Sequence, residues 1–320
     1  MQEIFFEILL IAMFAVGVGT ISSMVGIGGG IINTPLLIII FLLDAQKAPA
    51  TALVAALFVA IASSVAYYRQ EPRPTIFKAG LFLAITTIPG SLVGVALREL
   101  ITSDYVLRVI FGISLFPVAL KMLFARKRKG VKEELASFDF PDISKNRLAL
   151  SLVGGFIGGI AAGMLGIGGG AVVVPVLTIL MGLPIHAAVA TSMFTMIFTA
   201  SAGTARNFIG GHVDPFYGIA LGIGMIVGAQ IGPKIACRIN AAQLKQAFGL
   251  VLVFPLIKMM KLGQMWLDPQ NQSFTVATIG DIIIWLGIII PIAIIRVWLA
   301  RRDIAPLPET KEPCEIAPGP

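Results

Sequence analysis

The residues best suited to chemistry form a glycine-rich GxGGGxxxxP motif, which occurs twice with an offset of 140 residues. Its glycines are Gly26, Gly28, Gly29 and Gly30 in the first copy and Gly166, Gly168, Gly169 and Gly170 in the second, and its prolines are Pro35 and Pro175. Glycine permits backbone conformations that leave N–H groups unpaired, and a helix that starts there places partial positive charge at its first turn. The motif therefore predicts an anion-binding site made of backbone, with the two prolines as helix breaks.

Two nucleotide-binding motifs of soluble proteins also use glycine-rich turns, and the sequence excludes both in practice. A Walker motif needs Lys followed by Ser or Thr after its last glycine, whereas Ile31-Ile32 and Ala171-Val172 stand there. A Rossmann fingerprint needs a preceding strand and a later acidic residue, and neither is evident. The remaining alternative is that the glycines only let helices pack closely.

Polar side chains near the motifs extend the predicted substrate-binding site. Thr51 and Thr191 match across the two copies, and the other predicted members are Asn33, Thr34, Ser192, Arg206 and Gln230. Hydroxyl and amide groups could donate hydrogen bonds to an anion, and Arg206 could recruit one at the outer mouth. Each has a local alternative: a bond to a carbonyl one turn back, snorkelling of Arg206 to the interface, or an interhelical bond from Gln230.

Further matches show that the motifs belong to a duplication covering about 20–124 and 160–261. Gly90 and Gly94 match Gly228 and Gly232 at an offset of 138. Apolar segments recur along both halves, and the segments 31–43 and 171–183, which follow the glycines, are too short to cross a bilayer. They are expected to be half-helices.

Composition indicates that lipid surrounds most of the chain, since 57% of the 320 residues are hydrophobic and 13% are charged. We predict an all-α polytopic membrane bundle of about 10 (9–11) helices. Its expected parts are a first repeat (1–124), a basic cytoplasmic loop (125–147), a second repeat (148–262), an additional transmembrane helix (276–299) and a disordered tail (303–320).

The basic residues predict the orientation of the spans. Four segments, 69–78, 121–147, 234–245 and the chain from Arg296 onward, hold 18 of the 24 Lys and Arg residues and are expected on the cytoplasmic side. Arg98 and five other cations are left for the far side. Eleven crossings reproduce this pattern with the N-terminus outside and the C-terminus inside. Each half then has five crossings, so the two repeats are expected to be inverted.

Missing residue types argue against catalysis. No Asp or Glu lies at the centre of a predicted span, and no catalytic acid, serine or metal motif has suitable spacing. The two cysteines and two histidines are too scattered for a disulfide framework or a metal site. We expect a protein that is not an enzyme and has no cofactor, with a small anion and membrane lipids as partners, no nucleic acid, and a homo-oligomer left open.

The paired GxGGGxxxxP motifs, the following Ala-Thr pairs and the basic central loop resemble the TauE/SafE sulfite-exporter family, also called the TSUP permeases. This resemblance implies a multi-pass transporter of the bacterial inner membrane that carries small sulfur-containing anions such as sulfite or sulfonates. The expected mechanism is alternating access around a midplane site formed by the two half-helices. An anion channel, a permease for small carboxylates and a non-transporting scaffold are the alternatives.

Overall fold

The computed structural model describes residues 2–71, 73–101 and 144–236, together with 103, 105–107, 109, 110, 113, 253, 257, 279–288, 290 and 291. The chain divides into two compact units. The larger unit contains both glycine motifs, because it comprises Met1–Leu107 and Arg126–Leu244 with Cys314–Pro320. In the other unit, Ile284 and Trp285 pack against Val253 and Ile257.

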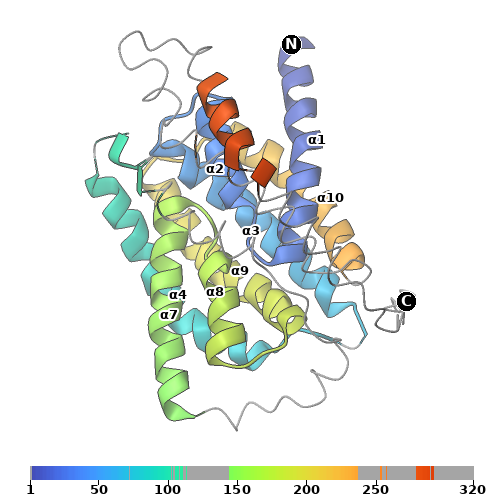
Figure 1. Ribbon diagram of the computed structural model, residues 1–320, viewed down its shortest axis with the longest axis vertical. Coiled ribbons are helices and arrows are strands. Elements are labelled where there is room, and N and C mark those ends of the chain that lie inside the picture. Colours follow the sequence, from blue (N-terminus) through green and yellow to red (C-terminus); the bar gives the residue numbers. More distant parts are fainter. Residues whose placement is uncertain are drawn as a thin grey trace. The chain divides into compact units, whose positions relative to one another are not determined.

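Helices of the larger unit follow one order twice (Figure 1). In the first half they are α1 (Gln2–Val25), α2 (Gly30–Ile39), α3 (Lys47–Tyr68) and α4 (Phe77–Leu100). In the second half they are α7 (Lys145–Leu165), α8 (Gly170–Pro175) with the π-helical turn η2 (Val176–Leu180), α9 (Ile185–Ile209) and α10 (Pro215–Ala236). The all-helical prediction is confirmed for these residues, and each glycine motif separates a long helix from a short one.

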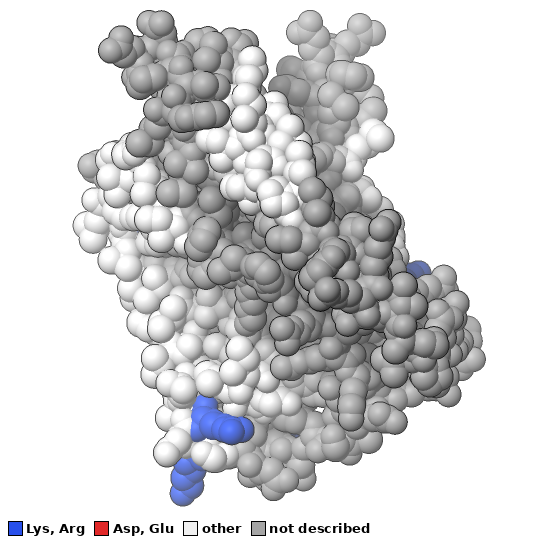
Figure 2. Space-filling model, in the orientation of Figure 1, with Lys and Arg blue, Asp and Glu red and all other residues white. Residues whose placement is uncertain are grey.

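Five of the described helices, α3, α4, α7, α9 and α10, are long and apolar enough to cross a membrane. Their outer faces are apolar: on α4, Leu81, Ile85 and Leu92 are exposed at helical spacing. The face drawn in Figure 2 is mostly uncharged over its described residues and carries a few basic side chains toward one end. Such a surface suits contact with lipid rather than water.

Small residues hold the halves of this unit together. α4 packs mainly against α7, and α1 mainly against α10 (Figure 1). A Cβ at Gly94 would overlap the Ile160 carbonyl of α7, and one at Gly228 would overlap the Val16 carbonyl of α1. These matched glycines therefore serve close helix packing, which is the alternative that the sequence left open for glycine in general.

Between these outer pairs, α3 packs against α9 and α10, and α9 also packs against α4. The α4–α9 hydrogen bonds join Gly80 to Thr195 and Thr87 to Thr199, with residue numbers rising together. The two helices therefore run in the same direction along their shared seam.

Several sequence predictions concern residues outside the described part. They include most of the basic loop at 125–147, most of the last part of each repeat, at 105–124 and 242–262, and the tail at 303–320. The predicted domain boundaries at these places stay predictions.

Two glycines of α1, one facing α10 and one not, allow a test of the packing. Gly19 and Gly17 both lie in α1, but a Cβ at Gly19 would stand 2.7 Å from the Met225 Cα atom, whereas one at Gly17 would meet nothing within 4 Å. Gly19→Ala should lower the free energy of unfolding by about 1–3 kcal/mol, because it forces α1 away from α10. Gly17→Ala should leave it unchanged or raise it by up to about 1 kcal/mol, because Ala favours the helix. Thermal unfolding in detergent measures both, and equal effects would contradict the close approach.

Candidate functional site

The two glycine motifs have the same backbone conformation. The left-handed region is occupied by Gly26, Gly28 and Gly29 (φ 80°, 84° and 76°) and by their counterparts Gly166, Gly168 and Gly169 (φ 71°, 73° and 86°). A side chain at these places would be strained, so the turns depend on glycine.

Both turns end at a helix start without a side-chain cap among the described residues. Gly29 and Gly169 are the residues that precede α2 and α8, and neither has a side chain to accept the first amides. The first N–H groups of a helix have no acceptor within that helix. Each start therefore offers amides and partial positive charge to an acceptor from elsewhere.

Each helix start lies against the first glycine of the opposite motif. A Cβ at Gly30 would overlap the Gly166 carbonyl, and one at Gly170 would overlap the Gly26 carbonyl. Thr34 donates a hydrogen bond to the Leu165 carbonyl at 3.1 Å, which ties α2 to the end of α7. The structure thus brings together all eight predicted motif glycines and Thr34.

Ser192, another predicted site residue, joins this centre from α9. Its hydroxyl donates to the Gly26 carbonyl at 3.2 Å, and the side chain is fully buried. Met196, one turn further along α9, lies between the motifs, because a Cβ at Gly28 or at Gly168 would overlap its sulfur. Sequence reasoning missed Met196, since a buried methionine has no spacing signal of its own.

Polar side chains are confined to the first motif. Ser22 and Asn33 are fully buried, and the Ser22 hydroxyl and the Asn33 Oδ1 atom have no hydrogen-bond partner. The Asn33 amide donates only to the Met225 sulfur, at 3.0 Å, and sulfur is a weak acceptor. At the offset of 140, Ala162 and Val173 stand in the second motif. The two halves of the centre are therefore chemically unequal.

The prolines have different consequences in the two short helices. Pro35 lies inside α2, which continues as an α-helix to Ile39. Pro175 ends α8, and the next turn is π-helical, with the Met181 amide donating to the Val176 carbonyl at 3.2 Å. Both short helices then end alike, in bonds from Leu43 to Leu37 and from Leu183 to Leu177.

Thr51 and Thr191 have matching contacts away from the glycine turns. Thr51 accepts a hydrogen bond from the Asp214 amide, just before α10, and Thr191 accepts one from the Ile76 amide, just before α4, both at 3.0 Å. Each hydroxyl thus holds the start of a helix from the opposite half. This pairing accounts for their correspondence in sequence without a ligand.

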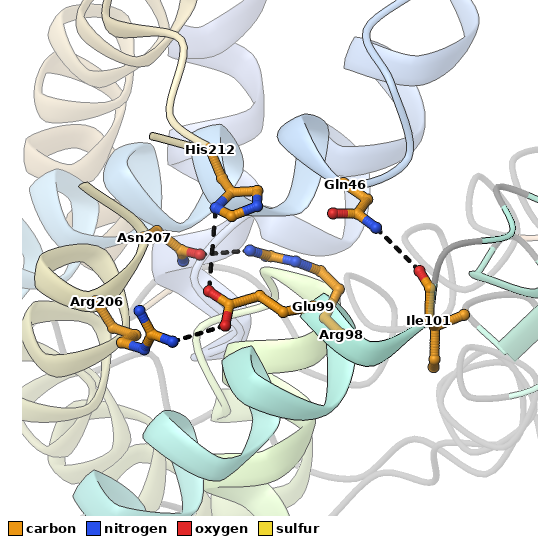
Figure 3. A network of polar contacts seen from close by, with 7 residues as sticks. All are labelled: Gln46, Arg98, Glu99, Ile101, Arg206, Asn207 and His212. Atoms are coloured by element: carbon orange, nitrogen blue, oxygen red, sulfur yellow. Dashed lines mark hydrogen bonds and ion pairs between the residues drawn. The ribbon is translucent and has the colours of Figure 1, made fainter. Parts of the chain in front are cut away.

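The structure gives Gln230 and Arg206 protein partners. The Gln230 amide donates to the Ala62 carbonyl of α3 at 3.0 Å, the interhelical alternative. Arg206 forms an ion pair with Glu99 at 2.7 Å, and Nδ1 of His212 lies 4.0 Å from the other Glu99 oxygen (Figure 3). Neither residue contacts the glycine turns in these bonds.

The burial of Arg98 was not predicted from the sequence. Arg98 was assigned to a far-side loop, but it lies in the last turn of α4 with its residue surface fully buried, beside Asn207 of α9 (Figure 3). The apolar span was predicted over 76–97, three residues short of the end of α4 at Leu100. The apolar run up to Leu97 and the small residue Gly94, one turn before Arg98, could have indicated that the helix continues beyond residue 97.

With this geometry established, comparison with known proteins identifies the family. The family model for the sulfite exporter TauE/SafE matches residues 10–259. The chain belongs to the TauE/SafE family. Curated relatives include the probable membrane transporter protein YunE of Bacillus subtilis, 28% identical over 254 residues, which are 75% of this chain and 90% of the relative.

Two further relatives carry the same kind of name. A probable membrane transporter protein of Methanocaldococcus jannaschii is 27% identical over 267 residues, covering 78% of this chain and 95% of that protein. YdhB of Bacillus subtilis, also named a probable membrane transporter protein, is 26% identical over 254 residues, covering 77% and 100%. No solved structure matches the chain. This TauE/SafE chain is a membrane transporter, in agreement with its apolar helices.

The role of the matched threonines can be tested directly. Thr51→Val should lower the free energy of unfolding by about 1–3 kcal/mol, because the Asp214 amide loses its acceptor, the buried Thr51 hydroxyl, in a partly buried place. Thr51→Ser keeps the hydroxyl and should retain most of the stability. Thermal unfolding in detergent measures this difference. Unchanged stability together with lost transport would instead support direct contact between Thr51 and the substrate.

Proposed function

We propose that this protein is a secondary transporter of small anions, with sulfite or organosulfonates as the first candidates. The substrate binds near the midplane of the membrane, where the starts of α2 and α8 meet, and alternating access exposes that site to each side in turn. The observation that carries this proposal is the reciprocal packing of two helix starts without side-chain caps, each against the first glycine of the opposite motif. Their amides and dipoles can bind an anion in a low-dielectric place without a buried lysine.

The first motif supplies the side-chain part of the proposed site. The Asn33 amide can exchange its weak sulfur acceptor for an oxyanion, and the unpaired Ser22 hydroxyl lies close to the start of α2. Hydrogen bonds to a charged acceptor are stronger than bonds to a thioether. We therefore propose that the substrate lies nearer α2 than α8, with Thr34 and Ser192 supporting the turns.

Matched contacts support a transport mechanism based on two related halves. The α4–α7 and α1–α10 pairs and the two threonine bonds connect equivalent elements across the halves. We propose that these halves are inverted repeats and that one rocks against the other around the glycine turns. Met196 stands between the turns and must shift when an anion bridges them.

The proposed location follows from the positive-inside rule and the family. We place the protein in a bacterial-type inner membrane with its basic central loop and C-terminus in the cytoplasm and its N-terminus outside. Under this orientation the C-terminal end of α4, with Arg98, faces the outside.

A channel and a carboxylate permease use the same helix starts and are separated from the main proposal by transport assays. Purified protein in proteoliposomes should show saturable counterflow, in which unlabelled sulfite inside drives uptake of labelled sulfite. Unitary currents without counterflow would show a channel. Stabilisation by acetate or other short carboxylates, but not by sulfite, sulfonates or thiosulfate, would change the substrate class.

A pair of variants tests the proposed site. Asn33→Ala removes an amide donor within α2, and Val173→Ala shortens the apolar side chain at the equivalent place in α8. Asn33→Ala should raise the Kd for sulfite about tenfold to hundredfold, which corresponds to about 1.5–3 kcal/mol for a hydrogen bond to a charged group.

Val173→Ala should leave the affinity for sulfite within about twofold, even where it lowers stability by removing buried methyl groups. Calorimetry on purified protein measures binding, and thermal unfolding checks folding. Equal Kd values for Asn33→Ala and wild type, in a folded protein, would contradict a binding role for Asn33.

A further inference from the structure

We infer that Arg98 and Asn207 form a second anion-binding site, placed at one end of a polar seam between α4 and α9. The ligand class is a small oxyanion, and the seam is the route between this site and the glycine turns. The inference builds on the proposed transport of anions, and its residues are distinct from those of the two motifs.

The first argument is the buried guanidinium. Arg98 has no exposed surface, and its Nη2 atom donates to the Asn207 side-chain oxygen. Its Nε and Nη1 atoms have no hydrogen-bond partner. A cation withdrawn from water in a membrane protein is costly unless acceptors surround it, and such residues mark substrate pathways. An oxyanion would supply acceptors for the Nε and Nη1 atoms.

Arg98 has no carboxylate at hydrogen-bond distance among the described residues, although Glu99 is its neighbour in sequence. Figure 3 shows the Glu99 carboxylate directed to Arg206 and His212. Asn207 is neutral, and its own Nδ2 atom is buried without a partner. The pair therefore offers three unpaired nitrogen atoms, two from Arg98 and one from Asn207, to one ligand.

The duplication provides a second, independent argument. At the offset of 138, Arg98 corresponds to Ala236 of α10, and at the offset of 140, Asn207 corresponds to Tyr67 of α3. The equivalent helices pack together without this cation and amide. The fold therefore has no general need for a buried arginine at this place, which favours a role in ligand binding.

The seam beyond Arg98 is lined by hydroxyl groups. Ser91 of α4 lies against Gly203 of α9, and the Ser91 hydroxyl is buried without a partner. Further along, Thr199 donates to the Thr87 hydroxyl at 2.7 Å. Next, Thr195 donates to the Gly80 carbonyl at 3.2 Å.

The equivalent seam between α3 and α10 is mostly apolar. Thr87, Ser91, Thr195 and Thr199 correspond to Met225, Ala229, Ala55 and Val59. Polar groups in a membrane interior favour a water-filled or anion-conducting path over purely apolar packing. The four hydroxyl residues of the α4–α9 seam therefore have apolar counterparts in the α3–α10 seam, where Gln230 supplies a hydrogen bond between the helices, and Arg98 lies at the end of the α4–α9 seam.

Transport kinetics of the full chain in proteoliposomes test the inference, with labelled sulfite as the probe. Arg98→Gln should raise the KM about tenfold or more while the maximal rate stays within about twofold, because a recruiting site acts on capture of the anion. Arg98→Lys keeps the charge and should recover part of this loss. If Arg98 served only to pack α4 against α9, Arg98→Lys would not be expected to lower the KM again.

Ser91→Ala provides a variant that should fold, because its hydroxyl has no partner to lose. It should raise the KM several-fold. Ser63→Ala is the matched control: Ser63 lies in α3, is equally buried, has an unpartnered hydroxyl, and corresponds to Gly203 in the other half. Its KM should equal that of the wild type.

The outcomes separate this inference from the proposed function. If the KM is unchanged in folded Arg98→Gln and Ser91→Ala but raised in Asn33→Ala, the second site is wrong and the glycine-turn site stands. If Ser63→Ala and Ser91→Ala raise the KM equally, the seam has no special role and the inference fails. If the wild type neither binds nor carries sulfite, sulfonates or carboxylates, the anion transport on which both proposals rest is wrong.

Discussion

The structure depends on one constraint: two helices are broken in the middle of an apolar environment, and their free backbone groups need partners inside the protein. Water can satisfy such groups in a soluble protein, whereas lipid cannot. Here the carbonyls of Gly26 and Gly166 lie against the first residue of the opposite short helix, and Ser192 donates to one of them. Only glycine allows both the turn and this approach. The first amides of α2 and α8 have no side-chain cap, and they make the space beside the turns suitable for an anion.

The two halves share the backbone conformation of their glycine turns but differ in many side chains. The three left-handed glycines, the final bonds of the short helices and the threonine caps recur in both halves. Asn33 and Ser22 in the first motif have apolar counterparts, as does Arg98 in α4. The shared parts are those that any broken-helix fold of this kind requires. The side chains that differ between the halves are not needed for the fold, so we propose that they determine which anion is bound.

Much of this arrangement is predictable from the sequence because its signals are periodic or repeated. Apolar segments gave the helices, and the offset of 140 between the motifs gave the two breaks. The identity of contacts between helices has no such signal. Gln230 and Thr51 could be recognised as polar residues in helices, but their acceptor and donor, Ala62 and Asp214, lie more than 160 positions away in the chain. Arg98 was missed because the predicted span ended just before it, so that a buried cation was assigned to a loop.

Met196 illustrates what duplication does at the contact between the copies. Its sulfur fills the space beside both Gly28 and Gly168, and its counterpart in the first half is Ala56, whose Cβ would lie 3.4 Å from a Cβ at Gly168. Two methionines would compete for one volume, and two alanines would leave it empty. One large and one small residue fill the space, so the two copies carry different residues at this position and the contact between them is asymmetric.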